Sequence, residues 1–212
     1  MKALARLMNR KPGIQNEDEF FVSAVLLPII EKNGNFSILF EVRSNCLRRQ
    51  PGEICFPGGK VEKPEMGRPW DSAVRETAEE LGISPGGVKL LGRLDCLINP
   101  PGSLIYPFVG MLTDCSKVKP NPDEVEEVFW APLSHFVKNP PAKSHVEVAT
   151  RYPKDFPFDK VQASYGEEWQ KRWTFPVYFY EYGERLIWGV TAKILYNFIS
   201  TCWPAGMTEA CS

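Results

Sequence analysis

The sequence of 212 residues lacks any apolar run of the ~18–20 residues that a membrane-spanning helix needs. Residues 1–13 include basic side chains but no apolar segment of signal-peptide length, so we expect a cytoplasmic protein that does not contact a membrane. The net charge of −1 provides no excess of positive charge for binding nucleic acid or anionic lipid. Neither a membrane nor a nucleic acid is therefore an expected partner.

Zinc sites of the cysteine–histidine type are also missing. No two cysteines form a Cys-x-x-Cys pair, and neither His135 nor His145 has a cysteine near it in sequence. We expect reduced thiols at all six positions, which are Cys46, Cys55, Cys96, Cys115, Cys202 and Cys211. With 43% hydrophobic residues, the chain has the composition of an ordinary globular protein.

The most informative stretch is residues 58–83, which opens with a glycine pair and ends in a predicted helix over residues 70–81. The helix is indicated by apolar residues at i, i+4 and i+7, which are Val74, Ala78 and Leu81. Asp71 or Ser72 is expected to cap its start, and Gly82 is expected to end it.

Opposite this apolar face, the helix carries an acidic patch. Glu76, Glu79 and Glu80 lie within about one turn, where three carboxylates repel one another unless cations lie between them. Mg²⁺ and Mn²⁺ prefer such carboxylate oxygens. Arg75 precedes Glu79 by four residues and can orient a carboxylate. The alternative is an acidic face that simply contacts water.

The spacing of this stretch resembles the signature of the Nudix hydrolases, which cleave a diphosphate linked to another moiety. Gly59 is followed after five residues by Glu65, and the ending Arg75-Glu76-x-x-Glu79-Glu80-x-Gly82-Ile83 is complete. Nine residues separate Glu65 from Arg75, where the family pattern has seven. The resemblance implies an α/β fold of the Nudix α/β/α sandwich type, with a mixed sheet between helices.

The same resemblance implies roles for the site residues. Glu76 and Glu80 would hold the principal Mg²⁺ or Mn²⁺, and Glu79 would complete the site, bind a second ion or act as a catalytic base. The carbonyl of Gly59 would be a further ligand, and Arg75 would orient the carboxylates. Such a cation polarises phosphoryl oxygens and lowers the pKa of bound water.

A second motif precedes the glycine pair. Its spacing is Arg43-Ser44, Arg48, Gly52 and then Phe56-Pro57-Gly58-Gly59, with three residues in each gap. This pattern resembles the coenzyme A pyrophosphatase branch of the Nudix family, although Leu39-Phe40-Glu41 stands where that branch favours Leu-Leu-Thr. Arg43 and Arg48 would then bind phosphates, with substrate also contacting Ser44, Gly52 and Gly58. The alternative is a solvated basic loop.

The resemblance implies a small-molecule diphosphate as partner. The preferred substrate is coenzyme A or acyl-coenzyme A, cleaved to 3′,5′-ADP and (acyl-)phosphopantetheine. A nucleoside diphosphate derivative such as ADP-ribose, or an oxidised nucleotide, is the second hypothesis, and a non-catalytic ligand-binding domain on the same fold is the third. A homodimer is an open alternative to a monomer.

Outside these motifs, the pattern predicts a single domain with its core over about residues 20–200. Strands are predicted at 20–30, 36–42, 88–98, 105–112 and 128–130, with a hairpin turn at Asn33-Gly34. A further hairpin over 175–188 and a helix over 191–198 close the pattern, the latter with Ala192, Leu195 and Phe198 on one face.

Two further stretches are an acidic segment that contains Glu124 and Glu127 and a segment without clear periodicity at residues 139–172. Glu124 and Glu127 are candidates for an additional metal ligand or catalytic base from outside the helix, the alternative being an acidic surface turn. Residues 139–172 are rich in proline, aromatic and charged residues without a clear period, which indicates an insertion or an edge hairpin.

Overall fold

The computed structural model describes residues 10, 13–100, 102–113, 115–161 and 168–204. In these residues the main sheet has eight strands, in the core order β3-β2-β1-β7-β5, with β4 also pairing with β1, β6 with β7 and β8 with β2. Their bounds are β1 Phe21–Lys32, β2 Asn35–Arg43, β3 Ile54–Cys55, β4 Gly58–Lys60, β5 Val88–Arg93, β6 Leu97–Asn99, β7 Ser103–Leu112 and β8 Val125–Pro132. β1 and β7 are parallel whereas the other pairs are antiparallel, so the sheet is mixed.

The predicted hairpin between the first two strands is confirmed. Lys32 pairs with Asn35, and the two residues between them, Asn33 and Gly34, have φ of 54° and 76°. Positive φ at both central positions is the geometry that matches the right-handed twist of the strands, and Asn-Gly adopts it readily.

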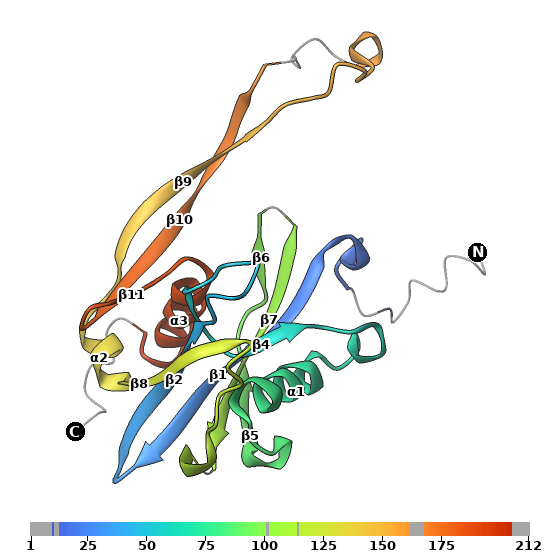
Figure 1. Cartoon of the computed structure of the whole chain (residues 1–212). Helices are drawn as coiled ribbons and strands as arrows, with labels where there is room; N and C mark the ends of the chain where they lie inside the picture. The colour runs from blue at the N-terminus through green and yellow to red at the C-terminus, as the bar shows by residue number, and fades with distance from the viewer. Residues whose placement is uncertain (1–9, 11–12, 101, 114, 162–167, 205–212) are drawn as a thin grey trace.

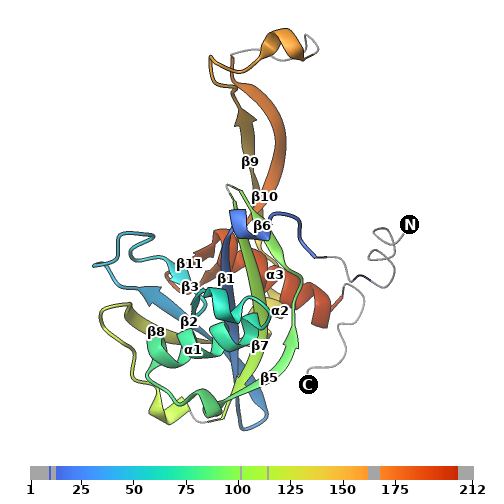
Figure 2. The same cartoon turned by 90° about the vertical axis from the view of Figure 1, so that its right-hand side faces the viewer.

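Helices cover both faces of the main sheet, which gives the α/β/α sandwich (Figures 1 and 2). Helix α1, Pro69–Leu81, packs on one face, where Ala73 and Leu81 join the buried cluster of Leu26 and Leu39. Helices α2, Leu133–Lys138, and α3, Gly189–Cys202, lie on the other face. There the predicted helical face is confirmed, and it packs on strand residues of β1 and β2: Ala192, Leu195 and Phe198 are buried with Leu27, Ile38 and Phe40.

A second sheet of three strands, in the order β11-β10-β9, adjoins the α3 side. Its strands are β9 Ala142–Thr150, β10 Gln170–Tyr182 and β11 Arg185–Trp188. Figure 1 shows β9 and β10 as a long twisted hairpin that extends away from the rest of the molecule. Within the described residues, no helix is long and apolar enough to cross a lipid bilayer.

Helix α1 departs from the prediction at its start and on its buried face. Arg68 occupies the N-cap position without a side-chain hydrogen bond, and Pro69 begins the helix, where its missing N–H has no cost. The buried positions include Ala73, Thr77 and Leu81, whereas Val74 is only half-buried. The predicted end is confirmed, since Gly82 has φ of 62°.

The single strand predicted over 88–98 is wrong. It is divided into β5 and β6, and β5 itself shifts register between Leu90 and Gly92. The split allows both short strands to pair with different parts of β7. A β-bulge of this kind bends a strand, which a pattern of apolar residues alone does not show.

Candidate active site

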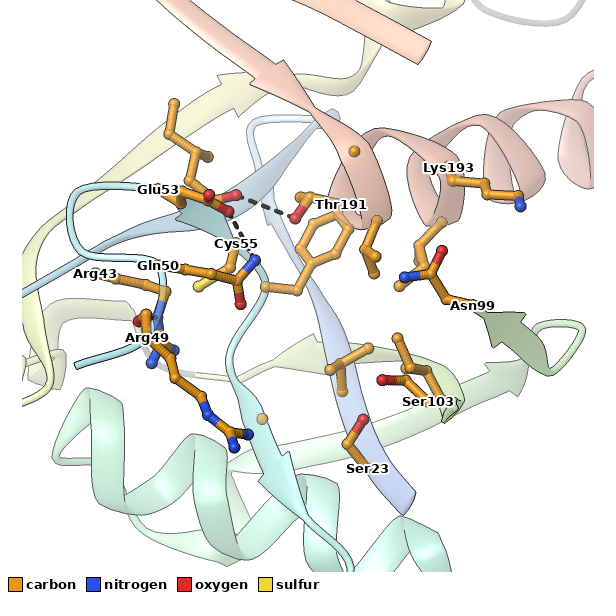
Figure 3. Close-up of a pocket in the computed structure, with 18 of the residues that line it drawn as sticks. Ser23, Arg43, Arg49, Gln50, Glu53, Cys55, Asn99, Ser103, Thr191 and Lys193 are labelled. Atoms are coloured by element: carbon orange, nitrogen blue, oxygen red, sulfur yellow. Dashed lines mark hydrogen bonds between the residues drawn. The ribbon is translucent and has the colours of Figure 1, made fainter. Parts of the chain in front are cut away.

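A cavity of about 690 Å³ opens between α1 and β4 on one side and β11 and α3 on the other (Figure 3). Its acidic wall contains Gly58, Gly59, Glu76, Glu80 and Glu124. The structure therefore brings the glycine pair, two glutamates of the helix and one from the loop before β8 to the same pocket.

The glycine pair is required by close packing. A Cβ atom on Gly58, whose φ is 145°, would lie 2.3 Å from the carbonyl oxygen of Ala24. A Cβ atom on Gly59 would lie 2.4 Å from the carboxyl carbon of Glu76. Any side chain at either position would displace the strand or the carboxylate, so glycine allows the backbone to reach the acidic side chains.

The turn at Gly58-Gly59 also fixes the carboxylate of Glu80 by a hydrogen bond. The backbone N–H of Gly58 donates to its Oε2 atom over 2.7 Å. Burial raises the pKa of Glu80 to about 8, with further increases from the charges of Glu76 and Glu124, while the Gly58 N–H opposes the shift. Burial also raises the pKa of Glu76, although Arg75 opposes it. Concentrated, poorly hydrated negative charge of this kind favours a bound cation.

Arg75 connects the carboxylates at the edge of the pocket. Its guanidinium lies 2.8 Å from Glu76, 3.2 Å from Glu65 and 3.4 Å from Glu79. Glu65 ends a short 3₁₀ helix, Lys63–Glu65, and also accepts a hydrogen bond of 2.7 Å from the Ser72 hydroxyl. The hydrogen bond from Arg75 lowers the pKa of the Glu65 carboxyl. Glu65 thus fixes Arg75 and the first turn of α1, despite the longer gap between Glu65 and the helix.

Glu79 does not line the main pocket, although Arg75 contacts both Glu79 and Glu76. Its side chain is 58% exposed, and it borders a second, shallower cavity with Trp70 and Val74. Among the described residues, no group of three histidine, cysteine, aspartate or glutamate side chains has the arrangement of a metal site. The roles predicted for Glu79 therefore stay predictions.

The loop that carries the arginines places two of them, but not Arg48, along the pocket. Arg43 and Arg49 line the pocket, and Figure 3 shows both on the same side of it, whereas Arg48 is exposed and is not part of the lining. The Arg43 Nε atom donates to the Arg49 carbonyl over 3.4 Å, which links the two. Gln50, with φ of 53°, turns the chain just after them. Arg49, which the spacing did not include, therefore lines the pocket, and the role of Arg48 stays a prediction.

Two other residues of this motif shape the loop. The N–H of Ser44 donates to the Glu124 carbonyl over 2.9 Å, and the Ser44 hydroxyl accepts from the Cys46 N–H. Gly52, with φ of 72°, donates its N–H to the Arg43 carbonyl. Neither residue lines the pocket. Their contacts position Arg43 and Glu124, so direct substrate contact by Ser44 and Gly52 is not what the structure favours.

Glu124 and Glu127 are separated by the sheet. Glu127 pairs with Val42 of β2, and its Oε1 atom accepts a hydrogen bond of 2.7 Å from Arg185. Because side chains alternate along a strand, Glu127 points to the face opposite Arg43 and the acidic wall. Glu124 lines the pocket. Glu127 does not line the pocket, so of the two candidates the position of Glu124 favours the predicted role.

Sequence reasoning missed Glu41 as a site residue. Its side chain is 1% exposed, and its Oε1 atom has no hydrogen-bond partner among the described residues. Burial raises the pKa of Glu41 well above its usual range, and the charge of Glu80 adds to the shift. The sequence signal was the departure from Leu-Leu-Thr, but only the pairing of strands on both sides of β2 reveals the burial.

The wall opposite the acidic residues was also missed. It contains Phe175, Pro176, Trp188 and Lys193, and Figure 3 shows Lys193 on the side of the pocket away from Arg43 and Arg49. The Thr191 hydroxyl donates to the Ile54 carbonyl over 3.0 Å, which ties α3 to β3 and fixes this wall. These residues are more than a hundred positions away from the glycine pair, so only the tertiary fold brings them together.

Comparison with known proteins agrees with this geometry. The NUDIX domain family matches residues 20–153. The chain belongs to the Nudix family. It is 37% identical over 133 residues to the mouse peroxisomal coenzyme A diphosphatase NUDT7, covering 63% of this chain and 55% of the mouse protein. It is 34% identical over 175 residues to the uncharacterized Nudix hydrolase NudL of Photorhabdus laumondii, covering 82% of this chain and 81% of that protein.

Among solved structures, a Caenorhabditis elegans Ap4A hydrolase in a binary complex is similar, at 21% identity and a TM-score of 0.46. The match covers 55% of this chain and 83% of that one. The chain spans just over half the length of the mouse relative.

Nudix enzymes generally use a divalent metal, and the donor chemistry of this pocket fits one. The carboxylates of Glu76 and Glu80 and the carbonyl of Gly59 are oxygen donors of the kind that Mg²⁺ and Mn²⁺ prefer. Both carboxylates have raised pKa values because burial removes their hydration, and Cβ atoms at the glycine pair would fill the space beside them. A cation would relieve this repulsion.

Proposed function

We propose that this Nudix protein hydrolyses a diphosphate linkage in the 690 Å³ pocket, using a divalent cation held by Glu76 and Glu80 with the Gly59 carbonyl. The observation that carries the proposal is the Gly58–Glu80 hydrogen bond, which holds a buried carboxylate beside Glu76 at a pocket that arginines also line. A cation bound there would polarise phosphoryl oxygens and lower the pKa of water.

The protein's own groups would position the substrate and move the proton. Arg43 and Arg49 lie on one side of the pocket, where their guanidinium groups would donate to the diphosphate oxygens. Arg75 would keep Glu76 oriented through its 2.8 Å contact. Glu124 is the best-placed base outside the helix, because it lines the pocket whereas Glu127 does not. Its carboxylate would accept the proton of the attacking water.

Coenzyme A or acyl-coenzyme A is the substrate that we infer, with 3′,5′-ADP and (acyl-)phosphopantetheine as products. Two findings support it: the arginine motif before the glycine pair, and the similarity to proteins that include the mouse coenzyme A diphosphatase. The pocket adds a third, since its far wall is apolar at Phe175, Pro176 and Trp188 and would pack against the pantetheine arm or an acyl chain.

The test is a side-by-side measurement of kcat/KM for coenzyme A, ADP-ribose and a deoxynucleoside triphosphate with added Mg²⁺, with products identified by mass. We expect the highest value for coenzyme A. A preference for ADP-ribose or the nucleotide would favour a nucleoside diphosphate derivative as substrate. No hydrolysis of any of the three with Mg²⁺ or Mn²⁺ would favour a non-catalytic binding domain.

The compartment is a separate proposal. The sequence favours the cytoplasm, while the name of the mouse relative places that protein in the peroxisome. Fluorescence microscopy of the tagged chain in its own cells would decide between the two.

A further inference from the structure

Glu41 occupies a central position beneath the acidic wall. Along β2, alternate side chains point to opposite faces, so Glu41 lies on the same face as Leu39, which packs with the α1 cluster, and as Arg43, which lines the pocket. Its backbone pairs with Cys55 of β3 on one side and with Val128 of β8 on the other. Strands flank the residue on both sides, and it is buried at 1% exposure.

The carboxylate has too few partners for a purely structural role. Among the described residues, its side-chain hydrogen-bond donor is the Cys55 thiol, 3.9 Å from Oε2, and a thiol is a weak donor. Oε1 is buried and has no hydrogen-bond partner among the described residues. The charged groups that face it are Glu80 of α1, Arg43 of β2 and Glu124 of the loop before β8. Burying an unpaired carboxylate is costly unless a cation or a proton compensates.

Glu41 is also the residue at which the sequence departs from the Leu-Leu-Thr pattern. The coenzyme A branch that the sequence resembles favours threonine here, and a hydroxyl can donate to a neighbouring carboxylate without adding charge. Glutamate adds a negative charge directly under Glu80. It would help to retain a divalent cation at Glu80, through the electrostatic attraction of a poorly hydrated carboxylate.

We propose that Glu41 is a positioning residue of the cation site: it acts through Glu80 and raises the affinity of this chain for a divalent cation above what threonine would give. The inference rests on the proposed function only in taking Glu76 and Glu80 as cation ligands. It does not depend on which substrate the enzyme cleaves.

The experiment measures Mn²⁺ binding to the full-length, substrate-free chain by calorimetry and by the electron paramagnetic resonance signal of free Mn²⁺. We expect Glu41→Gln to bind Mn²⁺ about 10–100-fold more weakly, the range that removal of groups behind metal ligands produces. Glu41→Asp keeps the charge and should recover part of the affinity. Glu31→Gln is the matched control, because Glu31 is an exposed glutamate near the end of β1 and should bind as the native chain does.

A second readout separates this role from loss of folding. In the metal-free state, Glu41→Gln should melt at the native temperature or above it, because it removes a buried carboxyl group whose Oε1 atom has no hydrogen-bond partner among the described residues and which lies near the like charge of Glu80. If glutamine disturbs packing, Glu41→Thr introduces the residue of the related branch, and it too should bind Mn²⁺ more weakly. Folded Gln and Thr variants that bind Mn²⁺ as tightly as the native chain would overturn the proposal.

The Mn²⁺-binding result can be told apart from the test of the proposed function. Weaker Mn²⁺ binding by the Glu41 variants would support the inference even if coenzyme A and the other diphosphates were not hydrolysed. Hydrolysis of coenzyme A by a Glu41→Gln variant with native Mn²⁺ affinity would leave the proposed function standing and refute the role of Glu41.

Discussion

The two walls of the pocket differ in how the chain builds them. The acidic wall comes mainly from a glycine turn and one helix within residues 58–80, with Glu124 added from the loop before β8, and burial raises the pKa values of its helix glutamates Glu76 and Glu80. The opposite wall comes from β10, β11 and α3, and it has Phe175, Trp188 and the cation Lys193. A short stretch of sequence therefore supplies the helix carboxylates of the first wall. The opposite wall, whose shape would select a substrate, depends on contacts between segments far apart in the sequence.

The largest expected effect concerns the acidic wall. Glu80→Gln should lower kcat for diphosphate hydrolysis by on the order of 10²–10⁴, the range between weakened metal support and lost proton transfer. The glutamine oxygen can still accept the 2.7 Å hydrogen bond from the Gly58 N–H, so the turn should remain intact. Turnover at saturating Mg²⁺ measures the effect. Asp71→Asn is the control, since that exposed carboxylate pairs only with Arg68 among the described contacts. Near-native turnover by Glu80→Gln would refute the assignment.

The same variant has a consequence for stability that needs no substrate. Because the folded-state pKa of Glu80 is raised from 4.5 to about 8, the native state binds more protons than the unfolded state between these values. The melting temperature of the metal-free chain should therefore fall as pH rises from 5 to 8. The raised pKa of Glu41 also makes the folded chain less stable as pH rises. The lowered pKa of Glu65 affects stability only at pH values below this range. In Glu80→Gln the fall should be shallower, as measured by circular dichroism in chelator.

The next largest effect concerns the arginines beside the acidic wall and the KM for substrate. Arg49→Ala should raise KM for a diphosphate substrate by roughly 10–100-fold, since a hydrogen bond to a charged group contributes about 1.5–3 kcal/mol. Arg48→Ala should change KM little, because Arg48 is exposed and does not line the pocket. The two adjacent residues have the same chemistry, so steady-state kinetics of the pair isolates position alone. A larger effect at Arg48 would show that the loop rearranges when substrate binds.

These adjacent arginines show where prediction from sequence stops. The end of α1 at Gly82 and the turn at Asn33-Gly34 depend on local φ preferences, and both were predicted correctly. Which arginine lines the pocket depends on how the whole loop folds against the sheet, which no residue pattern indicated. The absence of Glu127 from the pocket lining likewise follows from its pairing with Val42 in the sheet. Sheet register is a long-range property.

Helix α1 makes the same point for the carboxylates. The spacing correctly placed Glu76, Glu79 and Glu80 within one turn, and the family resemblance assigned the principal cation to Glu76 and Glu80, but neither indicated how deeply each carboxylate is buried. In the structure Glu80 is 7% exposed, whereas the Glu79 side chain is 58% exposed. Burial depends on what the sheet presents to the helix, namely the glycine turn under Glu80. The burial of Glu41, two residues before the arginine motif, could not be predicted for the same reason, although the sequence showed its departure from Leu-Leu-Thr.

The smallest expected effect tests the apolar wall. Trp188→Ala removes an aromatic side chain that lines the pocket, so we expect kcat/KM for coenzyme A to fall by roughly tenfold relative to ADP-ribose, near the lower end of what apolar contacts discriminate. Trp173→Ala is the matched control, because that tryptophan is 50% exposed on β10 and does not line the pocket. The ratio of kcat/KM values cancels any shared loss of folded enzyme. Because both substrates carry a diphosphate, an equal fall for both would mean that Trp188 supports the acidic wall itself, and the two walls would then not be separable.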